Sequence, residues 1–123
     1  MVETYISFYL KENRIHIFVD SLRGLGSPPR ICFLIEESGE TFMIAPYKKR
    51  DFKSHGVSPD VYHGTSSMEV SSMKLCRIIA GIHHWDLSRS YRVPGIIHTE
   101  QKVAVFSLTK AEIIDRVNTV QTR

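Results

Sequence analysis

Residues 14–46 read RIHIFVDSLRGLGSPPRICFLIEESGETFMIAP, and this stretch decides the fold. Alternate positions over residues 15–19 carry Ile or Val, which predicts a β-strand with one apolar face. Asp20 or Ser21 can cap a short helical turn after this strand, because their side-chain oxygens accept hydrogen bonds from free backbone N–H groups. Gly24 disfavours helix and keeps that turn short.

Two further strands follow the helical turn. Residues 31–35 form a continuous apolar run, which predicts a strand buried on both faces. The polar residues 36–40 predict a hairpin turn into a strand that ends at Pro46. A β-rich segment at 5–10 precedes the stretch and predicts a first hairpin with it. The stretch itself therefore predicts strand, short helix, strand, hairpin and strand.

The composition is that of a globular protein. Of the 123 residues, 42% are hydrophobic and 24% are charged, which suits one domain with its own core. The net charge of +3 and the pI near 9.0 are compatible with a nucleic-acid partner. No signal peptide is evident at the first residues, and no apolar run reaches the roughly 18 residues that span a bilayer. We therefore expect a cytoplasmic protein without membrane contact.

The middle of the chain changes character. Residues 47–67 combine Lys, Arg, Ser, Gly, Pro and His with few large apolar residues, which predicts a linker or a long mobile loop. A short strand is expected at 68–70. Ser71 or Ser72 then caps a helix that runs to about Trp85. The core-facing stripe of this helix is expected to be Leu75, Ile78, Ile79 and Ile82.

The last third predicts two strands and a helix. Residues 91–98 are typical of a strand, but Pro94 interrupts them. Because proline lacks an N–H group, we expect this strand at a sheet edge or with a bulge. Residues 102–108 predict another strand. Thr109 and Glu112 form a capping box for a C-terminal helix over 109–119.

These elements predict an α+β fold in a single domain, 1–123. Two β-α-β-β pseudo-repeats, at 5–46 and 68–108, flank the linker 47–67 and share the order strand, helix, strand, hairpin, strand. Their residue identity is weak, so two unrelated β-α-β-β runs explain the order equally well. We expect short antiparallel strands packed into a small barrel-like body, followed by the C-terminal helix 109–119.

The opening stretch also carries a family resemblance. Arg14 precedes the first strand, Arg23 lies in the short helix, Leu25-Gly26 ends that helix, and a hairpin follows. In this order the chain resembles the swapped-hairpin DNA-binding domain of the AbrB transition-state regulators and the related MazE-like antitoxins. The resemblance implies a swapped-hairpin body. With a true duplication, one chain would supply both halves of what the family builds from two chains.

Binding to DNA requires several cationic side chains on one surface, because contacts with phosphates release counterions. Arginine also offers two donors that match a guanine edge. Phe18 and Leu22 depart from the family pattern, which has a proline and a second helix arginine at these places. The residues expected to contact DNA are Arg14, Arg23, Lys48, Lys49, Arg50 and Lys53. The alternative for the last four is a solvated loop.

A second cluster, Arg89, Tyr91 and Arg92, lies near the expected edge strand. These side chains suit contact with a nucleic-acid backbone or with a partner protein. The alternative is a tyrosine packed on the helix beside two solvated arginines.

Other chemistry has weaker support in the sequence. Neighbouring His83 and His84 on a helix point about 100° apart and do not converge on one ion, so no metal site is expected. Cys76 as a nucleophile would need His83, His84 or His98 as its base, and its apolar helix position disfavours the thiolate. Cys32 and Cys76 lie in apolar runs, so we expect no disulfide. We expect no cofactor and no enzymatic activity.

The sequence therefore predicts a cytoplasmic, bacterial-type transcription regulator of the AbrB kind that binds double-stranded DNA. The alternative is a protein-interaction module, antitoxin-like or accessory to a mobile element, that binds a protein partner through apolar edge strands and the terminal helix. A homodimer is compatible with both hypotheses.

Overall fold

The computed structural model describes residues 1–51, 53–64 and 67–114. The described strands are β1 (Val2–Tyr9), β2 (Arg14–Phe18), β3 (Arg30–Ile35), β4 (Thr41–Pro46), β5 (Ser54–Gly56), β6 (Ser67–Ser71), β7 (Ser90–His98), β8 (Val103–Ser107) and β9 (Glu112–Ile113). The described helices are the 3-10 turns η1 (Leu10–Glu12) and η2 (Leu108–Lys110), and α1 (Val19–Gly24), α2 (Pro59–Tyr62) and α3 (Met73–His83). In this part of the chain no helix is both long and apolar enough to cross a membrane.

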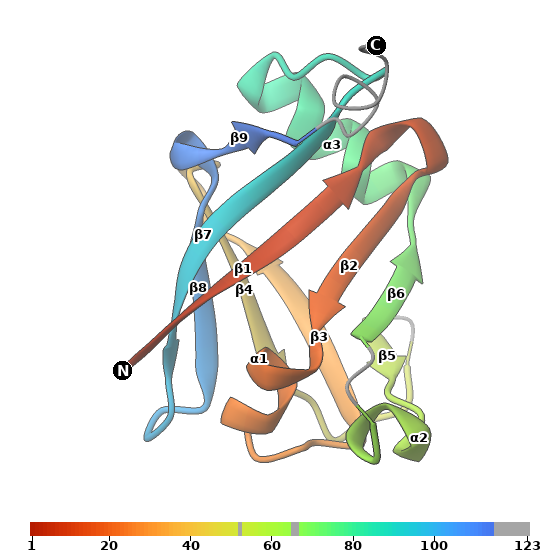
Figure 1. The fold of residues 1–123 in the computed structure, drawn as a ribbon, viewed down its shortest axis with the longest axis vertical. Coiled ribbons are helices and arrows are strands. Elements are labelled where there is room, and N and C mark those ends of the chain that lie inside the picture. Colours follow the sequence, from red (N-terminus) through yellow and green to blue (C-terminus); the bar gives the residue numbers. More distant parts are fainter. Residues whose placement is uncertain (52, 65–66, 115–123) are drawn as a thin grey trace, which may run out of the picture.

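The strands form one antiparallel sheet in the order β5-β3-β4-β8-β7-β1-β2-β6, and β9 pairs with β7. Twisted strands accumulate curvature, and here the sheet curls into a nearly closed barrel (Figure 1). The helix α1 lies at one end of the barrel, and α3 lies at the other (Figure 1). The predicted barrel-like body is confirmed. The seam of the barrel falls between the two outermost strands, β5 and β6.

Inward side chains of alternate strand positions fill the barrel. Phe8, Phe42 and Phe106 are fully buried, and the ring centroids of Phe8 and Phe42 are 5.7 Å apart. Near α3, the Trp85 ring stacks on Tyr91 with 4.5 Å between centroids. Burying one large apolar side chain contributes about 1.5–3 kcal/mol. These rings therefore supply a large part of the stability.

The prediction of an edge or a bulge at Pro94 is wrong. Strand β7 is unbroken and central, with β1 on one side and β8 and β9 on the other. The Ile114 N–H donates a hydrogen bond to the Ser90 carbonyl, so the backbone of Ser90 faces β9. Because backbone groups alternate between the two sides of a strand, every second residue after Ser90 also directs its N–H and C=O groups toward β9 and β8. Pro94 belongs to this set. It falls in the gap where the β9 pairing has ended at Arg92 and the β8 pairing has not begun, so its missing N–H costs no described pairing.

The helix α3 begins as predicted but presents another face to the core. The Ser72 hydroxyl caps it by accepting a hydrogen bond from the Leu75 N–H at 3.2 Å. The predicted stripe is wrong for Ile78 and Ile82, which are exposed. Since α3 lies at the barrel end, only one narrow strip of the helix reaches the core. The buried residues of α3 are Cys76, Ile79 and Ala80.

The segment 47–67 is more than a linker, because it contains β5 and α2. Ser58 caps α2 by accepting a hydrogen bond from the Asp60 N–H. Strand β3 is also less buried than predicted, because Leu34 points outward and is 46% exposed. An apolar run therefore gave a strand with only one face in the core.

The C-terminal helix predicted at 109–119 is wrong over its described part. There the chain forms η2 and then β9, which pairs Glu112 with Arg92 of β7. The free side of β7 offers backbone partners that outweigh a weak helix preference. Residues 115–119 lie outside the described residues.

The capping prediction for α1 is also wrong. Its N-cap is Phe18, without a side-chain hydrogen bond. The Ser21 hydroxyl is buried and bonds the Thr4 hydroxyl of β1 instead. This contact ties α1 to the sheet.

Candidate nucleic-acid interface

The outward sides of β6, β2, β1 and β7 form one continuous face. Antiparallel pairing sets side chains of neighbouring strands opposite each other, and alternation turns every second residue outward. Ile6 of β1 and Ile17 of β2 are fully buried, which identifies the other set as outward. The register gives two complete outward rows from β6 to β7: Ser71, Arg14, Tyr9 and Ser90; and Glu69, His16, Ser7 and Arg92. Next to them, Ser67 lies opposite Phe18, and Tyr5 lies opposite Pro94.

We call Tyr5, Tyr9, His16, Phe18 and Arg92 the outer aromatic face. The His16 ring lies 4.9 Å from the Phe18 ring and 6.1 Å from the Tyr9 ring, measured between centroids. The Arg92 guanidinium carbon lies 5.6 Å from the Tyr5 ring centroid, which is cation–π range. Tyr5 is 44% exposed. Tyr9, His16 and Phe18 are half-buried. Partly exposed rings beside an arginine offer a surface on which flat groups such as nucleobases stack.

An ion pair borders this face on β6. The Arg14 Nη1 donates to Glu69 Oε1 at 2.8 Å, and His16 Nδ1 lies 3.4 Å from Glu69 Oε2. These hydrogen bonds, with that from Arg14 the larger, hold the pKa of the Glu69 carboxyl below its usual range. Glu69 thereby fixes the positions of Arg14 and His16.

Ser7 lies at the centre of the outer aromatic face, opposite His16 on β2 and Arg92 on β7. Its side chain is almost fully covered, with 1% of the residue exposed. Among the described residues, its hydroxyl has no hydrogen-bond partner. A buried hydroxyl without a partner is uncommon in folded proteins.

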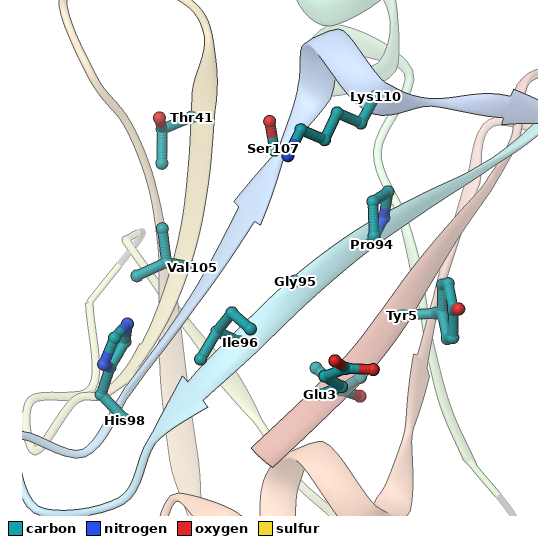
Figure 2. A pocket seen from close by; sticks show the side chains of 11 residues that line it. Glu3, Tyr5, Thr41, Pro94, Gly95, Ile96, His98, Val105, Ser107 and Lys110 are labelled. Atoms are coloured by element: carbon teal, nitrogen blue, oxygen red, sulfur yellow. The ribbon is translucent and has the colours of Figure 1, made fainter. Parts of the chain in front are cut away.

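A hollow of about 380 Å³ continues the face across β7 and β8 (Figure 2). It shares Tyr5 and Pro94 with that face. In Figure 2 the Lys110 side chain extends toward Ser107 at one end of the hollow, and His98 lies at the other. The remaining lining residues are Glu3, Thr4, Thr41, Gly95, Ile96 and Val105. A hollow of this size with a few polar groups can accept a small planar ligand.

The floor of the hollow depends on Gly95. A Cβ atom at this position would lie 2.4 Å from Phe106 Cδ1 and 2.7 Å from the Val105 carbonyl oxygen. The backbone of β7 therefore runs directly over the Phe106 ring, and only glycine fits.

The structure separates two of the arginines that the sequence predicts for DNA. Arg14 opens β2, whereas Arg23 lies in α1, beyond the other end of that strand. The Arg23 guanidinium donates to the carbonyls of Tyr62 and Gly64, at 3.1 Å and 2.8 Å, and lies 3.5 Å from Asp20. Arg23 thus holds α1 against the end of α2.

The basic segment after β4 divides between two places. Lys48 and Arg50 line a second hollow with Arg30, near the start of α2. Lys49 is exposed in the same segment. Lys53 instead lines a groove at the barrel seam.

The second predicted cluster also divides. Tyr91 is buried against Trp85, and its hydroxyl accepts a hydrogen bond from the Asp86 N–H, so it belongs to the core. Arg89 lies 3.7 Å from the Asp86 carboxylate. Only Arg92 joins the outer aromatic face.

Sequence reasoning missed Tyr5, Tyr9, His16 and Phe18 as site residues. All four lie in predicted strands, out of phase with the apolar residues that form the core. Assigning each strand position to a face, as alternation allows, would have turned them outward, but it would not have shown that their strands are neighbours.

The His, Cys, Asp and Glu side chains of the described residues show neither a metal site nor a reactive thiol. Within residues 1–51, 53–64 and 67–114, no three or more His, Cys, Asp or Glu side chains gather as metal ligands would. Burial raises the pKa of the Cys76 thiol to about 11, which keeps it protonated at neutral pH. Cys32 is also a buried free thiol.

Comparisons with protein-family models, with curated proteins and with solved structures give no significant match to this chain.

Proposed function

We propose that this protein binds single-stranded nucleic acid on its outer aromatic face. The observation that carries this proposal is that Tyr5, Tyr9 and Phe18 turn outward on the neighbouring strands β1 and β2, with His16 between the Tyr9 and Phe18 rings and Arg92 of β7 over the Tyr5 ring. Nucleobases stack on such rings whatever their sequence, and arginine pairs with the phosphates between them. The hollow at Gly95 gives one further base a place beside Lys110.

The size of the face supports a short contact. Neighbouring strands lie about 4.8 Å apart, so β2 to β7 spans about 10 Å, enough for roughly two to three stacked nucleotides. Each stacked base contributes about 1–3 kcal/mol. The Ser7 hydroxyl, between His16 and Arg92, can donate to a phosphate oxygen once the strand displaces the covering side chains.

The internal repeat is a second part of the proposal. The unit β2-α1-β3-β4 and the unit β6-α3-β7-β8 have the same order of elements. Phe33 pairs with Ile44 in the first hairpin, and Gly95 pairs with Phe106 in the second. Gly95 lies 62 residues after Phe33, and Phe106 lies 62 residues after Ile44, so the two hairpins have the same register. Strand β2 pairs with β6, and β4 pairs with β8, both antiparallel, as a twofold relation requires. This arrangement supports a duplicated chain of the AbrB-like, swapped-hairpin kind.

The AbrB-like hypothesis also supplies a second candidate function, a transcription regulator that binds double-stranded DNA. The observation in its favour is the hollow where Arg30, Lys48 and Arg50 come together. The lining of this hollow includes no acidic residue among the described ones. A duplex phosphate backbone would release counterions there.

One binding experiment separates the two. Fluorescence anisotropy is measured with a labelled oligothymidylate and with a labelled duplex, for the wild type, for Tyr5→Ala/Arg92→Ala and for Lys48→Ala/Arg50→Ala. We expect the first variant to lose about tenfold or more in affinity for the single strand, while the second stays within about twofold. Unchanged single-strand binding by Tyr5→Ala/Arg92→Ala would overturn the proposal. Loss of duplex binding in the second variant alone would favour the regulator.

A further inference from the structure

The barrel is incomplete on one side. On the closed side, β1 pairs with β7 along all eight of its residues and with β2 over Ile6–Tyr9. On the other side, β5 has three residues and pairs with β3 only at Arg30–Cys32. The outermost strand β6 pairs with β2 alone among the described strands. The seam therefore leaves the second half of β3 without a described strand on that side.

The free edge of β3 offers backbone groups to a ligand. The Tyr47 N–H donates to the Arg30 carbonyl, and the Glu36 N–H donates to the Thr41 carbonyl of β4. Even-numbered residues of β3 thus turn their backbone groups toward β4. Phe33 and Ile35, between them, turn theirs toward the seam. An added strand would pair at these residues.

A groove of about 520 Å³ lies along this edge, between β3 and the start of α3. Its apolar part includes Leu34 and Ile78, which are 46% and 44% exposed. Ile82, one turn beyond Ile78, is exposed as well. The other lining residues are Cys32, Phe33, Tyr47, Lys53, His55, Ser72, Lys74 and Leu75. Exposed apolar side chains beside a free strand edge are typical of a surface that a partner covers.

The charge of the groove restricts the partner. Lys53 and Lys74 belong to the lining, and Arg77 is exposed one helical turn beyond Lys74. The described lining includes no Asp or Glu, but the Asp51 carboxylate borders it and accepts hydrogen bonds from the Tyr47 hydroxyl and the Lys53 backbone N–H. The excess positive charge is therefore that of Lys74 and Arg77. A second copy of this chain, with a net charge of +3, would bring like charge to this surface. An acidic partner is complementary to it.

We infer that the seam groove binds an extended segment of a partner protein in which apolar and acidic residues alternate. The segment adds a strand to β3 at Phe33 and Ile35. Its apolar side chains contact Leu34 and Ile78, and its acidic side chains meet Lys74 and Arg77 at the rim. This surface shares no lining residue with the outer aromatic face.

The test is a selection of displayed random peptides of about nine residues, which exceeds the usual strand length of about five to six, against the wild-type protein. The matched proteins are Leu34→Glu/Ile78→Glu, with both changes in the groove, and Leu87→Glu, an equally exposed leucine outside it. We expect selected peptides to alternate apolar and acidic residues. Their affinity should fall about tenfold or more with the groove variant and stay within about twofold with Leu87→Glu.

Two readouts keep the test decisive. A selected peptide should slow amide hydrogen exchange at Phe33 and Ile35, and circular dichroism checks that the groove variant is folded. The inference is overturned if no peptide sequence is enriched, if enriched peptides bind the groove variant as well as the wild type, or if sedimentation shows that the groove variant abolishes a homodimer. Oligothymidylate binding by the groove variant should be unchanged, which separates this inference from the proposed function.

Discussion

Replacing Gly95 by alanine tests the packing that shapes the hollow. The new Cβ would meet Phe106 Cδ1 at 2.4 Å and the Val105 carbonyl oxygen at 2.7 Å, distances that real Cβ atoms essentially never show. The ring can turn, but the carbonyl belongs to a paired strand. Overpacking of this kind costs about 1–3 kcal/mol, and the lost glycine flexibility returns about 0.5–1 kcal/mol. We expect a net loss of about 1–2 kcal/mol, or about 3–8 °C in Tm.

Urea unfolding followed by fluorescence measures this loss, because the single tryptophan, Trp85, packs on Tyr91 in the folded state. Gly81→Ala is the control, since its new Cβ would meet no atom within 4 Å apart from the neighbouring backbone of its own helix. It should stabilise α3 by about 0.5–1 kcal/mol. Phe106→Leu should couple favourably with Gly95→Ala by about 0.5 kcal/mol or more. A Gly95→Ala protein as stable as the wild type would refute the reasoning.

Four further predictions concern single sites. Ser72→Ala should lower the free energy of unfolding by about 1 kcal/mol, because α3 loses its cap; denaturant unfolding that shows no loss would argue against the cap. The pKa of Glu69 is lowered in the folded state, so its ion pair with Arg14 stabilises the protein above the usual glutamate pKa and is lost as the pH falls through the lowered value. Between about pH 6 and pH 3 the free energy of unfolding, measured with urea, should therefore decrease less in Glu69→Gln than in the wild type. The difference should be below about 0.5 kcal/mol, because the ion pair is exposed. The Cys76 thiol, buried and with a pKa of about 11, should react slowly with a disulfide reagent at neutral pH and rapidly in urea; fast reaction of the folded protein would contradict its burial. Ser7→Ala should leave stability unchanged or raise it by about 1 kcal/mol, because the buried hydroxyl has no described partner; a clear loss in thermal unfolding would reveal a hidden bond.

Local patterns predicted the strands around the first helix well. The alternation at residues 15–19 and the turn at 36–40 define β2 and the β3-β4 hairpin nearly as expected. These signals depend on neighbouring residues, and neighbouring residues are what a sequence shows. The barrel-like body follows from many short antiparallel strands.

The failures have tertiary causes. Pro94 lies in a central strand only because two different partners, β9 and β8, leave a gap beside it. Ile78 and Ile82 suit a core-facing stripe, but α3 lies at the end of a barrel and not across a broad layer. The preference of residues 109–114 for helix is weak beside the free side of β7.

The candidate site was hidden for a different reason. Arg14 and Arg92 were predicted from their charge, whereas Tyr5 and Phe18 were assigned only to strands. They meet because β1 lies between β2 and β7, and that order of strands depends on pairing between distant segments. A sequence alone gives the face of each strand but not its neighbours.

The most direct test of nucleic-acid binding is photo-crosslinking of the wild-type protein to a 4-thiothymidine oligonucleotide, with the crosslinked peptides identified by mass spectrometry. Aromatic side chains that stack on a base lie within reach of the activated nucleotide. We predict crosslinks at Tyr5, Tyr9 or Phe18, reduced by excess unlabelled single strand and by salt. Crosslinks confined to the segment between β4 and α2, or their absence, would contradict the proposed interface.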